Sequence, residues 1–241
     1  MSKKSKLCIA AVGDLHVHAH SDGFYHDLFA EISESADVLL LCGDLTNLGL
    51  PEEAEELAKS FGGCRIPALG VLGNHDYENG KADEIKKILK ASKFIFLDEE
   101  PFELHGVGFA GVKGFGGGFG NHVLGSLGEP ALKAYVAESV NESLRLENLL
   151  GMLTAPKKVA VLHYSPIPET LRGEPQEIFP FLGSSRLADV IDRFDVTAAL
   201  HGHAHHGTHE GTTPKGTPVY NVSLELMRKK NPEAPYAFIE L

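Results

Sequence analysis

The sequence predicts an α/β fold with a largely parallel central region, and three observations support this prediction. Five continuous apolar runs have the composition of strands that are buried on both faces. Helix-like segments separate several of these runs, so that strand and helix alternate along the chain. Shorter stretches of alternating polarity predict antiparallel strands, which would form a second sheet or the edges of the first. Because no repeat, linker or low-complexity tract interrupts the 241 residues, we expect a single domain over residues 1–241.

The five apolar runs are the predicted strands of the parallel region. They cover residues 7–14, 37–44, 66–74, 157–164 and 196–203. The predicted helices lie at about 24–34, 51–61, 81–92, 130–153 and 184–194. Pro51 suits the first turn of its helix, where a missing backbone N–H is tolerated. The stretches with alternating polarity are 94–98, 102–112, 218–226 and 237–241.

A glycine-rich stretch, GVKGFGGGFGNH at 111–122, follows one of these stretches. It lacks both the Gly-Lys-Ser/Thr ending of a nucleotide-binding P-loop and the GxGxxG pattern that opens a helix after a strand. We interpret it as a flexible loop that leads into the long helix. With that helix it forms a possible lid or cap insertion at about 113–155, and the sequence leaves open whether residues 114–120 close over a site.

Composition restricts the classes of function. The formal net charge of −11 argues against a surface that coats nucleic acid, so we expect a small polar substrate. No stretch approaches the roughly 18 consecutive apolar residues of a membrane helix, and the N-terminal apolar run is too short for an export signal. The three cysteines, Cys8, Cys42 and Cys64, show no disulfide framework. These features predict a cytoplasmic protein without a membrane partner, and they leave its oligomeric state open.

Each of the five predicted parallel strands ends in residues that can bind a metal ion. Ligands commonly bind at the carboxyl ends of parallel strands, so these residues are expected to meet in one place. They are Asp14 and His16, Asp44, Asn74-His75-Asp76, His163, and His203 with His205. One such residue alone is more often a turn residue, a helix cap or a structural histidine. The occurrence of such residues at the ends of all five strands favours a shared site.

The ligand types indicate which ions the site would hold. Mixed Asp, His and Asn ligands without thiolates suit manganese, iron, zinc, cobalt or nickel. The ligands are too many for one tetrahedral ion, whereas two ions that share a carboxylate would use all of them. Two ions about 3.5–4 Å apart commonly promote displacement of an oxygen at phosphorus. The residues therefore predict a site for two divalent metal ions.

The ordered motifs carry a resemblance to a known family. Asp-x-His at 14–16, Gly-Asp at 43–44, Gly-Asn-His-Asp at 73–76, an isolated His163 and Gly-His-x-His at 202–205 resemble the signature of the calcineurin-like metallophosphoesterases. The resemblance implies a two-sheet β-sandwich flanked by helices, with four layers in the order αββα. It also implies a metal-dependent phosphoric ester hydrolase, in which a hydroxide that bridges the two ions attacks the phosphorus in line.

The same resemblance implies a role for each motif residue. The ligands of the first ion would be Asp14, His16 and His205. The ligands of the second ion would be Asn74, His163 and His203, and Asp44 would bridge the two ions. His75 would not bind metal; it would stabilise charge on the scissile phosphate or protonate the leaving oxygen, with Asp76 orienting it.

Two alternative functions remain open. The segment DLHVHAHSDG at 14–23 resembles the opening motif of the polymerase and histidinol phosphatase family, a class of multi-metal phosphatases built as a barrel. The spacing of this motif is one residue short for that family. Membership of that family would also leave the motifs at 43–44, 73–76 and 202–205 unexplained. The second alternative is a non-catalytic metal-binding scaffold of the same fold. Against it, every motif position holds a residue competent for catalysis.

The residues that would contact the substrate are less well defined. Arg172 and Arg186 lie between two site-bearing strands and suit phosphate through their planar guanidinium groups, and His18 is a third candidate. A solvated loop position explains Arg172 equally well, and we interpret Ser184 as a helix N-cap. By analogy with compact members of the family, we expect a small phosphodiester or phosphomonoester, cyclic nucleotides included, with the diester favoured.

Overall fold

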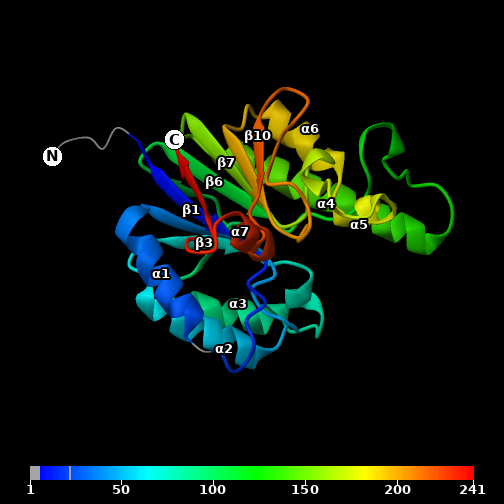
Figure 1. The fold of residues 1–241 in the computed structure, drawn as a ribbon. Coiled ribbons are helices and arrows are strands. Elements are labelled where there is room, and N and C mark those ends of the chain that lie inside the picture. Colours follow the sequence, from blue (N-terminus) through cyan, green and yellow to red (C-terminus); the bar gives the residue numbers. More distant parts are fainter. Residues whose placement is uncertain (1–5, 22) are drawn as a thin grey trace.

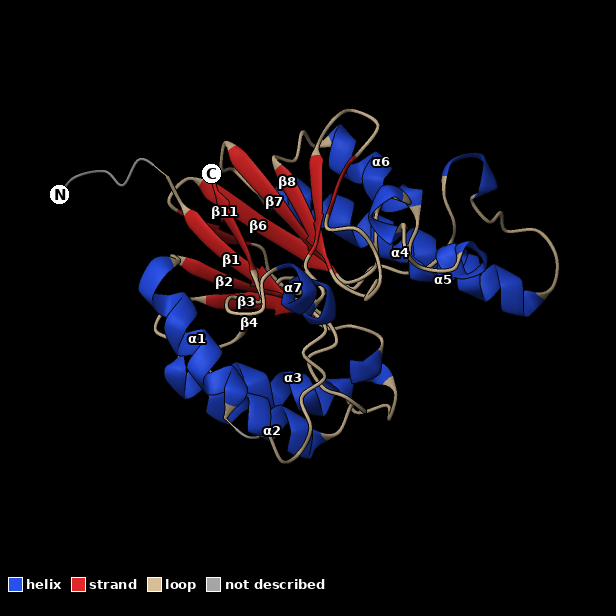
Figure 2. Cartoon of the chain, viewed as in Figure 1, coloured by secondary structure: helices blue, strands red, loops and turns tan. Residues whose placement is uncertain are grey.

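Two β-sheets pack face to face between layers of helices (Figures 1 and 2). The computed structural model describes residues 6–21 and 23–241. Within them, the strand order is β11-β1-β2-β3-β4 in the first sheet and β5-β6-β7-β8-β10-β9 in the second. The predicted four-layer αββα sandwich is confirmed. Asp22 of the segment 14–23 and residues 1–5 of the basic N-terminus lie outside the described residues.

The first sheet is parallel except at one edge. Its strands are β1 (Cys8–Val12), β2 (Val38–Cys42), β3 (Ala68–Val71), β4 (Ile95–Phe96) and the antiparallel edge strand β11 (Ala237–Glu240). Helices α1 (Phe24–Ser35), α2 (Pro51–Ser60) and α3 (Ala82–Ala91) cover its outer face.

The second sheet has a parallel centre of β6 (Val107–Val112), β7 (Lys157–Leu162), β8 (Ala198–His201) and β10 (Pro218–Asn221). Two antiparallel strands, β5 (Phe102–Leu104) and β9 (Glu210–Thr212), form its edges. Helices α4 (Pro130–Met152) and α6 (Ser185–Arg193) cover its outer face, and α7 (Leu224–Lys230) precedes the last strand. Within the described ranges no helix is both long and apolar enough to cross a membrane.

Burial on both faces explains the continuous apolar runs. In β1, Ala10 and Val12 pack under the helices of the first layer, whereas Ile9 and Ala11 face the second sheet. Side chains alternate across a strand, so a strand between two packed layers needs an apolar residue at every position. Burial of a large aliphatic side chain stabilises the fold by about 1.5–3 kcal/mol. The five predicted strands are therefore held firmly, and the polar residues that follow them are fixed in space.

The antiparallel prediction is correct at 237–241 but wrong in part elsewhere. Strand β4 lies parallel to β3, and β6 is a central strand parallel to β7. Gly108 and Gly111 give β6 its alternating appearance, yet every residue of β6 is buried. Residues 224–226 belong to α7, whose basic last turn suits a helix C-terminus.

The predicted lid segment, 113–155, divides into two parts. The C-terminal half of α4 packs on the second sheet, so Leu146, Leu149, Leu150 and Leu153 belong to the core. The glycine-rich stretch is tied to α5 (Phe179–Leu182) and its flank: the backbone N–H of Gly117 donates to Pro180 at 2.7 Å, and that of Gly118 donates to Gly183 at 3.0 Å. Residues 114–135 and α5 form a projection, here called the arm, on the side of the sandwich (Figure 1). The interpretation of the glycine-rich stretch as part of a lid over the metal centre stays a prediction.

Candidate metal centre

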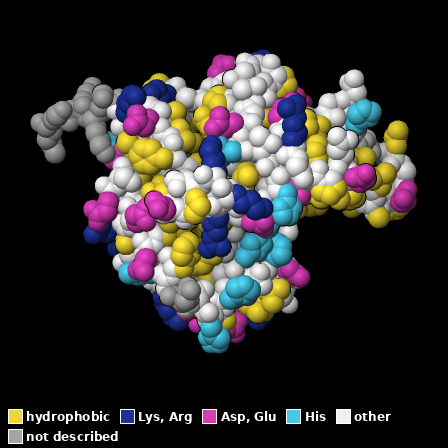
Figure 3. All heavy atoms as spheres, in the orientation of Figure 1, with side chains coloured by type: hydrophobic (Ala, Val, Ile, Leu, Met, Phe, Trp, Pro, Cys, Tyr) yellow, Lys and Arg dark blue, Asp and Glu magenta, His cyan; other side chains and the backbone are white. Residues whose placement is uncertain are grey.

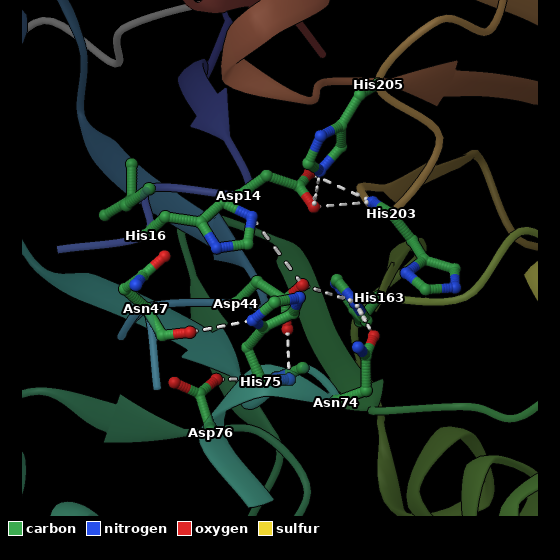
Figure 4. A network of polar contacts seen from close by, with 12 residues as sticks. Asp14, His16, Asp44, Asn47, Asn74, His75, Asp76, His163, His203 and His205 are labelled. Atoms are coloured by element: carbon green, nitrogen blue, oxygen red, sulfur yellow. Dashed lines mark hydrogen bonds and ion pairs between the residues drawn. The ribbon is translucent and has the colours of Figure 1, made fainter. Parts of the chain in front are cut away.

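The polar residues that follow β1, β2, β3, β7 and β8 meet at one edge of the sandwich (Figure 4). Three strands come from the first sheet and two from the second. The parallel direction within each sheet brings these carboxyl ends to the same side. All seven predicted metal ligands and His75 lie in this cluster.

One group of ligand atoms belongs to Asp14, His16 and His205, the set predicted for the first ion. Their ligand atoms lie within 4.8 Å of one another. His205 Nε2 lies 3.0 Å from Asp14 Oδ1. His16 Nε2 is buried and has no hydrogen-bond partner within the described part of the chain. A buried, unpartnered imidazole nitrogen beside a carboxylate fits a metal ligand, because a bound cation would compensate it.

A second group of ligand atoms belongs to Asp44, His163 and His203, again within 4.8 Å of one another. Asn74 joins this group, since its Oδ1 lies 2.9 Å from His163 Nε2. The ring Nδ1–H of His163 donates to the carbonyl oxygen of Cys42 at 2.9 Å. This bond fixes the tautomer in which Nε2 presents a lone pair to the site.

Asp44 lies between the two groups. Its Oδ2 is 3.4 Å from His163 Nε2 and 3.9 Å from His16 Nε2. Its Oδ1 accepts a hydrogen bond from the backbone N–H of His75 at 2.8 Å. One carboxylate oxygen thus faces a histidine of each group, which is the position that a bridging ligand needs.

The backbone at the site adopts conformations that L-residues rarely use. Asp14, His16, Asp44 and His203 have φ values of 57°, 45°, 48° and 70°. A positive φ costs a residue with a Cβ on the order of 1–3 kcal/mol and persists where surrounding structure enforces it. Four predicted metal ligands carry this strain, so the fold gives up stability to hold these side chains in place.

Two motif glycines make room for ligands from other strands. A Cβ at Gly43, whose φ is 81°, would lie 2.5 Å from His163 Nδ1. A Cβ at Gly202 would lie 2.4 Å from Asp14 Oδ2. Glycine at these positions lets the ends of the two sheets approach closely enough to bring both ligand groups together.

The electrostatics of the buried ligands favour a bound cation. Burial opposes ionisation of Asp44, but the imidazole of His163 outweighs it and holds the pKa of Asp44 well below its usual range. Burial disfavours the charged form of His163, yet Asp44 prevails and raises the pKa of His163 to about 9. Burial lowers the pKa of His203 to about 3, so that this imidazole is neutral and ready to coordinate. In the metal-free protein a proton on His163 supplies positive charge that an ion would replace.

Comparison with known proteins agrees with this geometry. A sequence profile of the calcineurin-like phosphoesterases matches residues 8–207. This chain belongs to the calcineurin-like phosphoesterase family. Membership supports a metal-binding hydrolase of phosphoric esters. The barrel-type phosphatase alternative is not supported, because the fold is a sandwich. No curated protein sequence matches the chain significantly.

Solved structures share the fold at low sequence identity. A phosphopantetheinyl hydrolase from Mycobacterium tuberculosis has a TM-score of 0.72 and 15% identity, over 98% of this chain and 96% of that one. TT1561 of Thermus thermophilus has a TM-score of 0.63 and 16% identity, over 92% of each chain. GAP50, the anchor in the inner membrane complex of Plasmodium, has a TM-score of 0.56 and 15% identity, over 93% of this chain and 73% of that one. At these identities the likeness shows the shared fold alone.

The predicted role of Asp76 as the partner of His75 is wrong. The ring Nδ1–H of His75 donates to the main-chain carbonyl of Asn47 at 2.7 Å. Asp76 is buried and accepts from the backbone N–H groups of Leu45, Thr46 and Gly73 and from the Thr46 hydroxyl. Asp76 therefore holds together the loops after β2 and β3. The sequence shows no signal for Asn47, because its contribution is a backbone carbonyl.

The predicted substrate contacts lie outside the ligand cluster. Within the described residues, none of the polar contacts of the metal centre involves His18 or Arg172, and both are exposed. The Arg186 guanidinium donates to the carbonyl of Leu124 in the arm at 2.7 Å. Ser184 caps α6, as predicted, by accepting from the backbone N–H of Arg186.

Sequence reasoning also missed Glu225, which lies on α7 beyond the last motif. Its Oε2 is 3.6 Å from His205 Nδ1, on the side of the ring away from Asp14. A carboxylate behind a metal-binding histidine helps to orient the ring. No motif marks Glu225, so only the packing of α7 reveals it.

Proposed function

We propose that this chain is a phosphoesterase that uses two divalent metal ions to hydrolyse a small phosphodiester or phosphomonoester, with the diester favoured. The observation that carries the proposal is the position of the Asp44 Oδ2 atom, which faces both ligand groups. Manganese, iron, zinc, nickel and cobalt all suit the Asp, His and Asn donor set. When bound, two such ions would lower the pKa of a water molecule and offset the negative charge of the phosphate.

The protein residues divide into ligands and groups that act on the substrate. Asp14, His16 and His205 would hold one ion, and Asn74, His163 and His203 the other, with Asp44 shared. The backbone strain and the buried hydrogen bonds described above fix these side chains before any ion binds. Preorganisation of this kind keeps the ligands from relaxing during the reaction.

His75 is the group best placed to act on the leaving oxygen. Its Nδ1–H is used by the Asn47 carbonyl, so its Nε2 is the atom that can donate or accept a proton at the substrate. The ring stands edge-on to His16 at a centroid separation of 4.6 Å, which places it beside the first ligand group. A protonated Nε2 would stabilise negative charge or protonate the leaving oxygen.

The same proposal covers partners and location. The formal net charge of −11 and the absence of a long basic stripe in the sequence support a small phosphoester over nucleic acid as the substrate. Cys8, Cys42 and Cys64 are free thiols, which supports a reducing compartment such as the cytoplasm.

Hydrolysis of bis-(p-nitrophenyl) phosphate and of p-nitrophenyl phosphate tests the proposal. Protein stripped of metal is given manganese, nickel, zinc or iron, and the release of p-nitrophenol is followed. We expect activity that depends on added metal, with the diester preferred, and its loss in Asp44→Ala and in His205→Ala. Full activity in either variant would remove the two-ion model. A protein that binds two ions but cleaves neither compound would favour the non-catalytic scaffold.

A further inference from the structure

One lysine and three aromatic rings adjoin the metal centre, and the roles assigned above do not use them. These residues, Lys113, Tyr77, Phe115 and Tyr164, are here called the lysine-aromatic cluster. The Lys113 ammonium lies 4.7 Å from the ring centroid of Phe115, 5.3 Å from that of Tyr164 and 5.7 Å from that of Tyr77. At these distances the rings attract the cation and help to stabilise its half-buried position.

The cluster is attached to the same backbone segments as the metal ligands. The Tyr164 ring centroid lies 4.4 Å from that of His203 and 5.5 Å from that of His163. The main-chain carbonyl of Lys113 accepts the backbone N–H groups of His163 at 3.1 Å and of Tyr164 at 3.0 Å. Tyr77 ends the short helical turn that begins at His75. The cluster is therefore held in a fixed position next to the second ligand group.

Lys113 has hydrogen-bond donors that the protein does not use. An ammonium group has three donors, and that of Lys113 donates to the carbonyl of Gly114 at 3.0 Å. Within residues 6–21 and 23–241 it forms no salt bridge. Burial lowers the pKa of Lys113, and the Glu142 and Glu138 carboxylates oppose this effect without forming an ion pair with its ammonium. A bound anion would compensate the half-buried charge.

Aromatic rings continue from the cluster onto the arm. The Phe115 ring centroid lies 4.8 Å from that of Tyr135, which lies 6.3 Å from that of Phe181. Phe181 is 60% exposed, so the last ring is open to solvent. Figure 3 shows hydrophobic side chains (yellow) on the surface of the arm. Stacking of a nucleobase on such rings contributes about 1–3 kcal/mol per base.

We propose that the lysine-aromatic cluster binds the leaving group of the substrate, and that this leaving group carries a second anion and a planar ring, as a nucleotide does. This inference rests on the proposed function, since the scissile phosphate must lie at the metal centre. Lys113 would pair with the second anion, and Phe115 would contact the planar ring.

A dinucleotide with a 5′-terminal phosphate has this chemistry. Hydrolysis breaks the bond between phosphorus and the 3′ oxygen of the first nucleotide. The oxygen of one water molecule bonds to phosphorus, and one proton goes to the leaving 3′ oxygen. The leaving group is then a nucleoside 5′-phosphate, whose phosphate and base are the groups that the cluster would bind.

The kinetic test compares 5′-phosphorylated diadenylate with diadenylate that lacks the terminal phosphate. In manganese-loaded wild type we expect kcat/KM to be at least about tenfold higher for the phosphorylated compound, the effect of one charge-assisted hydrogen bond. Lys113→Gln should bring the ratio close to one, and Lys113→Arg should keep it. Lys87→Gln, an exposed lysine on α3 outside the cluster and the arm, is the control. A ratio near one in wild type, or an unchanged ratio in Lys113→Gln, would overturn the proposal.

Equilibrium binding supplies a readout that does not depend on turnover. AMP and ribose 5-phosphate are titrated by calorimetry into the metal-free proteins, so that their phosphate can neither bind metal ions nor be hydrolysed at the metal centre. Lys113→Gln should weaken both by about tenfold, and Phe115→Leu should weaken AMP alone. Unchanged AMP affinity in Lys113→Gln, or equal effects of Phe115→Leu on both ligands, would contradict the assignment. If wild type cleaves no phosphoester, the proposed function fails, and the AMP titration still tests whether the lysine-aromatic cluster binds a nucleotide.

Discussion

The backbone N–H of His203 donates to both carboxylate oxygens of Asp14, each at 2.9 Å. Asp14 follows β1 in the first sheet, and His203 follows β8 in the second. The bond therefore joins a ligand of the first predicted ion to a ligand of the second across the two sheets. It fixes the carboxylate of Asp14 before metal binds, and it ties the two halves of the metal centre into one unit.

Replacement of His205 should remove one ion and leave the other. His205 belongs to the first ligand group alone, so His205→Ala should lower the number of manganese ions bound per chain from two to one. Metal analysis after gel filtration measures this number. His26→Ala is the control, because that imidazole is exposed on α1 and belongs to neither ligand group. A wild-type count retained by His205→Ala would show that its ring is no ligand.

Replacement of His75 separates catalysis from metal binding. His75→Ala should keep both ions, because each predicted ion has its ligands without His75. Turnover should fall by about 10²–10⁴, the usual effect of losing a general acid. The comparison needs kcat and the bound metal measured on the same sample. Loss of an ion in this variant would mean that His75 is itself a ligand.

Asp76→Asn should destabilise the fold. The carboxylate accepts hydrogen bonds from three backbone N–H groups and one hydroxyl. The NH₂ group of an asparagine side chain would point at some of these donors and could not accept from them. Each buried group left unsatisfied costs about 1–3 kcal/mol, so we expect the free energy of unfolding to fall by at least about 2 kcal/mol. Urea unfolding checks this value. Asp189→Asn, at an exposed position on α6, should change it little, and equal effects of the two variants would refute the structural role of Asp76.

The stability of the metal-free protein should fall as pH rises through 9. Asp44 outweighs burial and raises the pKa of His163 to about 9, above the ordinary value of 6.5. A raised folded-state pKa stabilises the fold fully below pH 6.5, and this contribution is lost as the imidazole deprotonates. Thermal unfolding in a chelator between pH 6.5 and 9.5 measures the loss. The melting temperature of His163→Asn should decline less steeply with pH than that of wild type. Parallel curves for the two proteins would argue against the coupling of Asp44 and His163.

Most of the fold, and the gathering of the predicted ligands at one edge of the sandwich, follow from the sequence for physical reasons. The strands that carry the ligands are buried on both faces, so their apolar runs are unmistakable, and chemically distinct residues follow each one directly. Strand direction was harder to predict: β6 is a central parallel strand whose two glycines imitate an edge pattern.

Residues that support the metal centre through their backbone, or through packing of elements distant in the sequence, could not be predicted. The carbonyl of Asn47 holds His75, although any residue supplies a carbonyl. Adjacency in the sequence suggested Asp76 for that task, but its buried carboxylate is taken up by backbone N–H groups. Glu225 and Lys113 meet the centre through the packing of α7 and β6, which no local pattern records.

The central claim is that two ions share Asp44, and electron paramagnetic resonance of the manganese-loaded protein tests it most directly. Two ions that share a carboxylate lie about 3.5–4 Å apart. We predict two manganese ions per chain with the spectrum of an exchange-coupled pair, and loss of that coupling in Asp44→Ala. One ion per chain, or two ions with uncoupled spectra, would contradict the account.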